Sequence, residues 1–413
     1  MPLKFTRATN LPIGVDLGSA TVTLAQLRLV DRKYELVSAA AACLKRSEET
    51  TPTDGKSTGV VDLAAGACKI RELLSQNNFK GRCSILSMPA ADTFVRHLKI
   101  PKALLDDLAA SPRQLDQAIR WELFNQVNQV NQVNQAKQTD QQNQETGKNT
   151  EGKTVEGRGE SPGTYDVHEA IVRHIVVGQE IYEDGQPKEE AIAFCVSRPA
   201  LERYLVMARQ AGIEVVGVNV ESCAIMECFS RLFRRAVDLE HVFMFVDLGA
   251  TSTQVVISHG PRMVFARNLR HGGQDFDRAA ADALGIEPHE AHDVRLGSVK
   301  PSGSNADEHA ASPSRPGAGD PSQYLERPLS DLTGQISGCL DHYEGVFGNR
   351  NVDRMVFTGG GAYDTWLCNQ LALQLDLPGQ IGNPLLNVRT TGTASQPDWT
   401  VAVGLSIGAG VAA

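Results

Sequence analysis

A short pattern occurs twice in this chain, once near its beginning and once after its midpoint. Ile13–Thr21 reads as an apolar strand, then Asp-Leu-Gly, then small and hydroxyl-bearing residues, and Met244–Ser252 follows the same plan. Each copy predicts a strand, a tight turn and a second strand, because Asp and Gly favour hairpin turns. A single copy would be common in unrelated hairpins. Two copies, each opening one half of the chain, predict a duplicated fold with two facing sites.

The rest of the chain alternates between predicted strands and helices, which is typical of α/β architecture. The predicted strands are Ile13–Asp16, Thr21–Leu29, Tyr34–Ala41, Cys83–Met88, Ala191–Val196, Val215–Val220, Phe243–Asp247, Thr253–Ser258 and Asp353–Thr358. The predicted helices are Leu63–Asn77, Gln114–Phe124, Pro199–Ala211, Ser222–Ala236 and Asp275–Leu284.

Two polar tracts interrupt a chain that, at 413 residues, is too long for one ordinary core. Asn125–Gly163 opens with a Gln-Val-Asn repeat, and Ser298–Gln323 is rich in Ser, Pro, Gly and Ala. Both contain too few large apolar residues to offset the entropy lost on ordering, so we expect both to be disordered. A weaker break is predicted at Arg46–Thr58.

Charge and cysteine content narrow the classes of function. The net charge of −9 and the pI near 5.6 argue against a nucleic-acid-binding protein, which needs clustered lysine and arginine. Eight scattered cysteines without a CxxC pair are typical of small buried side chains in a reducing compartment. The most apolar end, Trp399–Ala413, is shorter than the roughly 20 residues of a membrane span. We therefore expect a cytoplasmic protein without a signal peptide that reaches a membrane only through a partner.

The two predicted turns carry groups that suit the phosphates of a nucleotide. Gly18 and Gly249 let backbone N–H groups approach phosphate oxygens closely. The hydroxyls of Ser19, Thr21 and Thr251 add further donors.

A carboxylate stands directly before each turn. Asp16 and Asp247 could hold the hydration shell of Mg²⁺, which binds nucleotide phosphates and keeps several of its waters. Two such hairpins facing each other would enclose a triphosphate from both sides. The alternative is a pair of ordinary β-hairpins without a ligand.

Two glycine-rich segments lie immediately before predicted helices. Their residues are Gly359, Gly360, Gly361 and Ala362 in one segment, and Gly272 and Gly273 in the other. Bare backbone at the start of a helix accommodates a ribose or a phosphate, so both segments are candidate ligand contacts. A tight turn without a ligand is the alternative for each.

The order of these segments resembles that of the actin, hexokinase and heat-shock chaperone ATPases. The resemblance implies a duplicated, two-lobed actin-like ATPase (ribonuclease H-like) fold with an inserted subdomain, and ATP and Mg²⁺ as ligands. It also implies that the two turns are phosphate loops and that Gly359–Ala362 is the adenosine motif. Glu221 falls where the chaperones place an acid near Mg²⁺ and the attacking water, which would make it the catalytic residue. An equal alternative for Glu221 is a carboxylate favoured by the helix dipole.

Within this superfamily the chain is most similar to the PilM family of type IV pilus assembly proteins. The segments that carry the similarity are Ser87–Pro89, Val95–Pro101, Ala118–Glu122, Ala211–Ser222, Leu284–Ala291, Leu340–Tyr343 and Gly382–Leu385. Two departures stand out: a polar tract interrupts the helix after Phe124, and the loop Val294–Tyr324 is longer than is usual in the family.

The resemblance also implies domain boundaries. The expected first lobe comprises residues 10–85 and 200–238, and the inserted subdomain comprises residues 86–199 with the tract 125–163. The expected second lobe comprises residues 239–275 and 330–413, with a small subdomain at residues 276–329 that contains the loop 298–323.

As a function, the resemblance implies a cytoplasmic ATP-binding scaffold that captures the cytoplasmic tail of an inner-membrane PilN-like protein. Such a scaffold would be peripheral at the inner membrane through its partner, in a pilus machine or the related type II secretion machine. Slow ATP hydrolysis and a homo-oligomer stay open. The alternatives on the same fold are a small-molecule kinase, which would need an acidic base in a sugar pocket, and an FtsA-like filament protein. The second would end in an amphipathic membrane helix, but Ile407–Ala413 has no charged face.

Three further residues have less specific interpretations. Trp121 is expected in the core or lining a groove. His271 is expected at a surface turn, although its position would also allow contact with a ribose. Arg295 with Glu290 is expected either near adenine or as a solvated helix pair.

Overall fold

The computed structural model describes residues 8–44, 62–106, 114–125, 170–183, 185–297, 322–348 and 350–408. Its contacts divide the chain into a main unit, Met1–Phe94 with Leu201–Ala413, and an inserted unit, Val95–Ala200. The predicted break at Arg46–Thr58 and the disorder predicted for residues 126–163 and 298–321 lie outside the described residues. The last two residues of the tract Ser298–Gln323 do not follow the prediction, because a helix begins at Ser322.

The first half of the main unit forms a six-stranded sheet in the order β1-β3-β2-β5-β9, with β4 paired to β3. Its strands are β1 (Thr9–Asn10), β2 (Ile13–Leu17), β3 (Thr21–Val30), β4 (Lys33–Cys43), β5 (Cys83–Met88) and β9 (Glu214–Val220). The strands β2, β3 and β4 run antiparallel, whereas β2, β5 and β9 run parallel.

The second half repeats this plan in a five-stranded sheet, β12-β11-β10-β13-β14. Its strands are β10 (Val242–Leu248), β11 (Thr253–His259), β12 (Arg262–Leu269), β13 (Arg354–Thr358) and β14 (Gly379–Ile381). Again three antiparallel strands are followed by two parallel ones. The predicted duplication is therefore confirmed at the level of strand order and direction, although β12 was not predicted.

Helices connect and cover the two sheets of the main unit. They are α1 (Leu63–Gln76), α4 (Arg198–Ala211, beginning in the inserted unit), α5 (Glu221–Ser230), α6 (Gly273–Leu284), α7 (Pro288–Gly297), α8 (Ser322–Phe347), α9 (Thr365–Gln374) and α10 (Thr400–Gly408). Short 3-10 turns are η1 (Ala90–Asp92), η2 (Ala236–Leu239), η3 (Gly360–Tyr363) and η4 (Pro397–Trp399).

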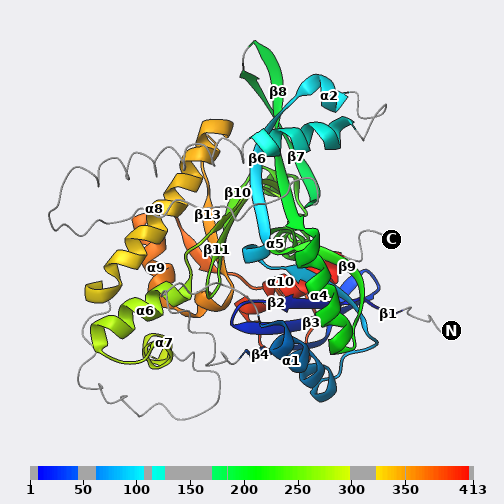
Figure 1. Cartoon of the computed structure of the whole chain (residues 1–413), viewed down its shortest axis with the longest axis vertical. Helices are drawn as coiled ribbons and strands as arrows, with labels where there is room; N and C mark the ends of the chain where they lie inside the picture. The colour runs from blue at the N-terminus through cyan, green and yellow to red at the C-terminus, as the bar shows by residue number, and fades with distance from the viewer. Residues whose placement is uncertain are drawn as a thin grey trace, which may run out of the picture. The chain divides into compact units, whose positions relative to one another are not determined.

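The helices α5 and α10 cross between the two halves (Figure 1). α10 packs on β2, β3 and β5 of the first sheet, and α5 lies against β5 and β9 of that sheet and against β11 and β12 of the second. At the crossing, a Cβ on Gly404 would lie 1.8 Å from the carbonyl oxygen of Ala224 in α5. Only glycine allows the two backbones to approach so closely, so this residue sets the packing of the two halves.

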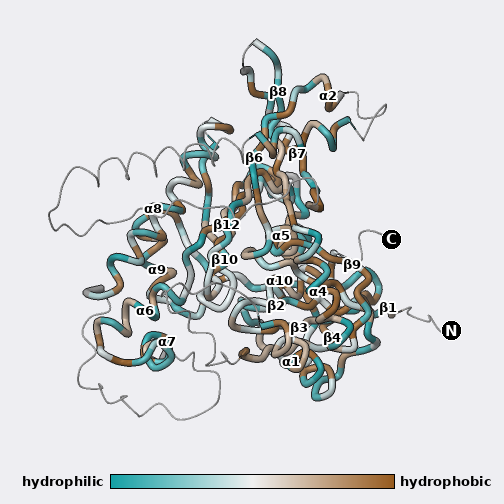
Figure 2. The backbone as a smooth tube through the Cα atoms, viewed as in Figure 1, coloured by the Kyte–Doolittle hydropathy of each residue, from teal (hydrophilic) through white to brown (hydrophobic). Residues whose placement is uncertain are grey.

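The long helix α8 is amphipathic, with polar and apolar residues alternating along its length (Figure 2). Its buried face is formed by Leu325, Leu329, Leu332, Ile336, Cys339 and Tyr343. These residues recur every three or four positions, which is the spacing of one face of a helix. The helix packs beside α6, α9 and β12 and so covers the second sheet.

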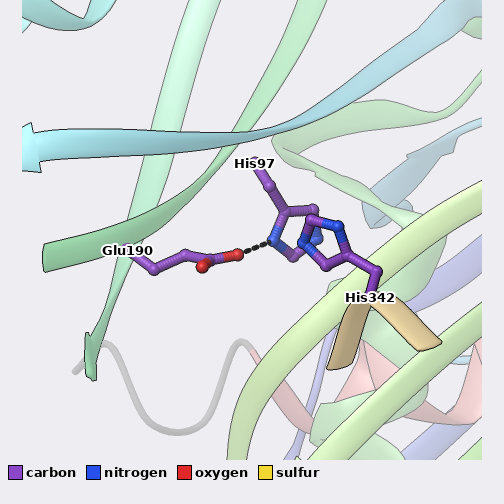
Figure 3. Close-up of side chains that lie close together, drawn as sticks. All are labelled: His97, Glu190 and His342. Carbon is purple, nitrogen blue, oxygen red and sulfur yellow. Dashed lines mark hydrogen bonds and ion pairs between the residues drawn. The ribbon is translucent and has the colours of Figure 1, made fainter. Parts of the chain in front are cut away.

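The inserted unit has its own three-stranded sheet in the order β6-β8-β7. Its elements are β6 (Thr93–Pro101), α2 (Lys102–Asp106), a helix at residues 114–125, β7 (Ala170–Glu183) and β8 (Gln186–Ser197). Within it, Nδ1 of His97 lies 2.6 Å from Oε1 of the buried Glu190 (Figure 3). This pair compensates a carboxylate that burial alone would penalise. His342, also drawn in Figure 3, belongs to α8 of the main unit.

Two sequence-based predictions differ from the structure. The helix predicted to run to Ala236 ends at Ser230, where the chain enters loops and η2. Trp121 was expected in the core or lining a groove, and its side chain is 66% exposed, so it does not lie in the core. The helix 114–125 instead buries its opposite face through Leu115, Ile119 and Leu123. Among the helices that the structure describes, none combines the length and apolar character needed to cross a membrane.

Candidate functional site

The two turns predicted from the repeated pattern meet in the main unit. The first turn, Gly18–Thr21, is closed by a hydrogen bond from the Gly18 N–H to the Thr21 carbonyl (2.9 Å). The second turn, Gly249–Ser252, is closed in the same way from Gly249 to Ser252 (3.0 Å). The hydroxyl of Thr251 donates to Oγ of Ser19 across 3.0 Å, which joins the two turns directly. Hydroxyls and backbone N–H groups from both halves therefore converge on one place.

The aspartates that precede the turns have equivalent surroundings. Asp16, on β2, accepts a hydrogen bond from the hydroxyl of Ser87 on the parallel neighbour β5 (2.7 Å). Asp247, on β10, accepts one from the hydroxyl of Thr358 on the parallel neighbour β13 (2.8 Å). Each carboxylate is thus held by the next strand of its own sheet, which fixes its direction at the end of the strand.

The carboxylates of this site repel one another in a buried environment. Burial, with repulsion from Asp247 and Asp398, raises the pKa of Asp16 to about 7, although the Ser87 hydroxyl opposes the shift. Burial and Asp398 likewise raise the pKa of Asp247 to about 6. For Glu221, burial followed by repulsion from Asp16 and Asp247 raises the pKa well above its usual value. The three predicted acids therefore share one electrostatic site.

Glu221 begins α5 and is held by two donors from different halves of the main unit. Its Oε2 atom accepts a hydrogen bond from the Ala90 N–H (3.1 Å) and another from Nε2 of Gln254 on β11. The position at a helix N-terminus and the position beside the other acids are both observed, so the two interpretations of Glu221 are compatible. Its carboxylate is oriented by Gln254, which the sequence analysis did not identify.

Asp398 is a fourth acid that the sequence analysis missed. It lies in η4, directly before α10, and accepts a hydrogen bond from the hydroxyl of Tyr363 (2.9 Å). Burial raises the pKa of Asp398, and its charge in turn raises the pKa of both Asp16 and Asp247. The only local signal for Asp398 is its position directly before a strongly apolar helix. That signal is not specific, so the sequence alone does not identify Asp398 as part of the site.

This group of acids suits a divalent cation. Within the described part of the chain, no lysine or arginine forms an ion pair with Asp16, Glu221, Asp247 or Asp398. Half-buried carboxylates that crowd together without a positive partner are costly, and bound Mg²⁺ with its waters would relieve that cost through oxygen ligands alone. The residues present therefore fit the cation that the sequence analysis expects.

The Gly272–Gly273 segment packs against the second turn. The Gly273 N–H donates to the Gly249 carbonyl (2.9 Å), and the Gln274 N–H donates to the Ala250 carbonyl (2.8 Å). A Cβ on Gly272 would lie 2.6 Å from the Ser252 nitrogen, closer than a side chain allows. These glycines join the start of α6 to the turn.

The third glycine-rich segment also borders the second turn, and its three glycines have different roles. Gly359 has a φ of +79°, and a Cβ on Gly361 would lie 2.6 Å from Cβ of Leu248, so both positions need glycine for the fold. A Cβ on Gly360 would meet no protein atom within 4 Å. Ala362 is buried in the 3-10 turn η3. Gly360 is thus the member of this segment that borders open space.

The surface position expected for His271 is wrong, and so is one of the two interpretations of Arg295, the solvated helix pair. His271 is buried rather than at the surface, and burial lowers its pKa. Arg295 is neither solvated nor paired with the exposed Glu290: its side chain is 5% exposed and bonds Asp277 (2.9 Å) and Asp364. Asp364 follows the Gly359–Ala362 segment closely and caps the N-terminus of α9. The bond from Arg295 to Asp364 therefore connects α7 with that segment.

Comparisons with known proteins were consistent with this geometry. A family model described as type IV pilus assembly protein PilM matches residues 183–409. Among solved structures, a PilM–PilN type IV pilus biogenesis complex has a TM-score of 0.67 at 18% identity, covering 96% of this chain and 98% of that one. No curated protein sequence matches the chain.

Two more distant structures extend over similar lengths. The ethanolamine utilization protein EutJ from Carboxydothermus hydrogenoformans has a TM-score of 0.48 at 12% identity, covering 97% of this chain and 89% of that one. MreB5 of Spiroplasma citri bound to AMPPNP has a TM-score of 0.45 at 15% identity, covering 97% and 96%.

The expected two-lobed actin-like fold is confirmed by the repeated sheets and by the likeness to the PilM structure. The matched span begins in the inserted unit at β7 and runs through α10, so it excludes the PilM-like segments Val95–Pro101 and Ala118–Glu122. Because the family model covers more than half of its length, this chain belongs to the family of type IV pilus assembly proteins PilM.

Proposed function

We propose that this protein is a Mg-ATP-binding scaffold of a type IV pilus assembly platform. The observation that carries the proposal is the meeting of the two turns through Thr251 and Ser19, beside four carboxylates without a positive partner among the described residues. The backbone N–H groups and hydroxyls of the turns suit phosphate oxygens, and the acids suit the accompanying cation.

Each predicted site residue has a role in this proposal. The hydroxyls of Ser19, Thr21 and Thr251 would donate to the phosphates. Gly18, Gly249, Gly272 and Gly273 would let the ligand approach closely, since their own N–H groups bond within the protein. Asp16 and Asp247 would hold Mg²⁺ through its waters, and the cation would neutralise charge on the phosphates. Gly359–Ala362 contacts adenosine, with Gly360 leaving the open space that a ligand needs.

Glu221 is proposed to orient the attacking water. Burial and repulsion from Asp16 and Asp247 raise the pKa of Glu221, so its protonated form is favoured more than in an ordinary glutamate. A cation bound beside these acids would favour the ionised form, which can accept a hydrogen bond from water. We expect hydrolysis to be slow, which suits a scaffold that uses nucleotide binding more than turnover.

The proposed partner is the cytoplasmic tail of a PilN-like inner-membrane protein, which would hold this protein peripherally at the inner membrane. Family membership and the solved PilM–PilN complex support this choice over a small-molecule kinase. The inserted unit offers an exposed aromatic side chain, Trp121, on a helix whose opposite face is buried. An exposed tryptophan is a common anchor for an apolar peptide residue.

Calorimetric titration with Mg-ATP tests the nucleotide site. Gly360→Ala adds a methyl group to open space, so we expect an unchanged melting temperature but about tenfold weaker ATP binding. Gly334→Ala on α8 is the matched control, since its Cβ also meets nothing within 4 Å. Absence of ATP binding by the parent, or equal binding by the parent and Gly360→Ala, would contradict this assignment.

Titration with the tail peptide of the PilN-like protein tests the partner. We expect micromolar binding, because a disordered tail loses entropy on binding, and a loss of about tenfold or more in Trp121→Ala. Leu373→Ala is the control, because Leu373 is an equally exposed apolar residue (73%) on α9 of the main unit. Equal affinity of all three proteins would remove Trp121 from the proposed contact.

A further inference from the structure

The turn Pro89–Thr93 is where the chain leaves the main unit for the inserted unit. It contains η1 and joins β5 to the start of β6, and the inserted unit begins at Val95. The chain returns to the main unit within α4, at Leu201. Three sets of side-chain hydrogen bonds hold this turn, and they come from different elements.

The first set comes from the proposed nucleotide site. Oε2 of Glu221 accepts the Ala90 N–H (3.1 Å), and the same oxygen accepts Nε2 of Gln254. Both bonds go to one oxygen, so a movement of the Glu221 carboxylate toward a ligand in the site would lengthen at least one of them. The peptide group of Ala90 is therefore bonded directly to an acid of the proposed nucleotide site.

The second set comes from Asn268 on β12. Its Nδ2 donates to the carbonyl oxygens of Ala90 (3.3 Å) and Thr93 (3.0 Å), and so spans the turn. Both partners are acceptors, which fixes the orientation of the amide. Asn268 is also the cross-strand partner of Gln254 in the β11–β12 ladder, which places the two amides side by side on one face of the sheet.

The third set comes from the point of return. The hydroxyl of Tyr204 on α4 donates to Oδ2 of Asp92 (2.8 Å), and Tyr204 is 1% exposed. Arg203 adds a longer ion pair to Asp92 (3.6 Å). The two segments that connect the main unit with the inserted unit are thus tied to each other at η1.

We propose that Glu221, Gln254 and Asn268 couple the occupancy of the nucleotide site to the inserted unit through the turn Pro89–Thr93, with Asn268 as the positioning residue. The inference rests on the proposed function of the site. It deepens that function, because the inserted unit carries the proposed partner contact. By thermodynamic linkage, ATP and a peptide bound to the inserted unit must change each other's affinity by the same factor.

Amide hydrogen exchange of the full chain, with and without Mg-ATP, tests the coupling. In the parent, we expect Mg-ATP to change exchange in β6 and β8 of the inserted unit. In Asn268→Ala, we expect ATP affinity within about threefold of the parent, but less than half of the ATP-induced change in exchange. A purely structural role would alter exchange equally with and without nucleotide.

A matched control and a second variant complete the design. Asn77→Ala removes an amide that also donates to a backbone carbonyl, that of Leu73 (2.9 Å), at the end of α1. We expect it to keep the full ATP-induced change. Tyr204→Phe keeps the ring and removes only the bond to Asp92, so it carries the test if Asn268→Ala does not fold, with the same loss expected.

Two results would overturn the inference, and they are distinguishable by calorimetry. If the parent does not bind Mg-ATP, the proposed function fails and the coupling fails with it. If the parent binds Mg-ATP but exchange in β6 and β8 is unaltered, or alters equally in the parent, Asn268→Ala and Tyr204→Phe, the coupling alone is wrong.

Discussion

The two turns of the site share one frame but differ in how firmly the surrounding protein holds them. Both are closed by the same backbone hydrogen bond, and both follow an aspartate that accepts a hydroxyl from the neighbouring parallel strand. Around the second turn, the N–H groups of Gly273 and Gln274 donate to the turn carbonyls, and Gly361 packs against Leu248. Around the first turn, one backbone bond, from the Leu44 N–H to the Ala20 carbonyl (2.8 Å), performs the corresponding role among the described residues.

The room for a side chain at the two turns differs too, and it is again smaller at the second turn. A Cβ on Gly18 would lie 3.4 Å from the Thr21 carbonyl oxygen, an ordinary contact, whereas a Cβ on Gly249 would lie 2.8 Å from that of Ser252. The repeated pattern thus accounts for the paired aspartates and hydroxyls, whereas the surrounding packing is closer at the second turn. The first turn is expected to adjust more easily when a ligand binds.

The largest expected effect comes from filling the space around each turn. In Gly272→Ala the new Cβ would overlap backbone atoms of Ser252 and Ala250, so we expect a loss of about 1–3 kcal/mol in the free energy of unfolding. Gly18→Ala meets no such overlap, so we expect a loss below about 1 kcal/mol. Chemical denaturation of both variants measures the difference. Equal losses would show that the two turns are equally tight.

The two turns also differ in the pKa of the aspartate that precedes each of them, and this difference can be measured through the pH dependence of stability. The pKa of folded Asp16 is raised to about 7, well above that of an unfolded aspartate, so between about pH 4 and 7 the folded state binds the extra proton. The free energy of unfolding therefore falls as the pH rises through this window. We expect Asp16→Asn to reduce the fall and to be more stable than the parent at pH 7.5, by about 1–2 kcal/mol.

Asp247→Asn provides the comparison for this prediction. The pKa of Asp247 is raised only to about 6, so its effect on the free energy of unfolding ends at a lower pH. The gain in the free energy of unfolding at pH 7.5 should therefore be smaller in Asp247→Asn than in Asp16→Asn. Unfolding curves from pH 4 to pH 8 measure both variants without added metal. A larger gain in Asp247→Asn would reverse the proposed order of the two acids.

The smallest expected effect concerns the bond that joins the turns. Thr251→Val and Ser19→Ala each remove one hydroxyl of the 3.0 Å contact, and a double-mutant cycle isolates the pair. We expect a coupling energy near the lower end of the roughly 0.5–1.5 kcal/mol of a single hydrogen bond, because the pair is only part-buried. A coupling energy of zero would mean that the ligand-free turns do not hold each other.

Much of the site was predictable because its main parts are local in sequence. The repeated Asp-Leu-Gly pattern predicted both hairpins, and the strand Cys83–Met88 was predicted with the bounds that the structure shows. The partners of the acids were not predictable in this way. Ser87 is 71 residues from Asp16, and Thr358 is 111 residues from Asp247, so no local pattern connects them.

The incorrect predictions have the same origin. His271 and Arg295 were interpreted from their neighbours in sequence, yet each is buried by elements that the sequence does not place beside it. Of the two positions expected for Trp121, core or groove lining, the core is wrong, because the helix at residues 114–125 turns its other face inward.

The sequence by itself determined the duplication, the two turns and the acids beside them, because hairpin geometry depends on residues only a few positions apart. Only the tertiary structure decided that Asp398 joins these acids and that Gln254 and Asn268 connect Glu221 with the turn Pro89–Thr93. The contacts of Gln254 and Asn268 arise where α5, β11 and β12 pack together, and Asp398 is brought to the site by η4. Packing depends on the shape of the whole core rather than on any short pattern.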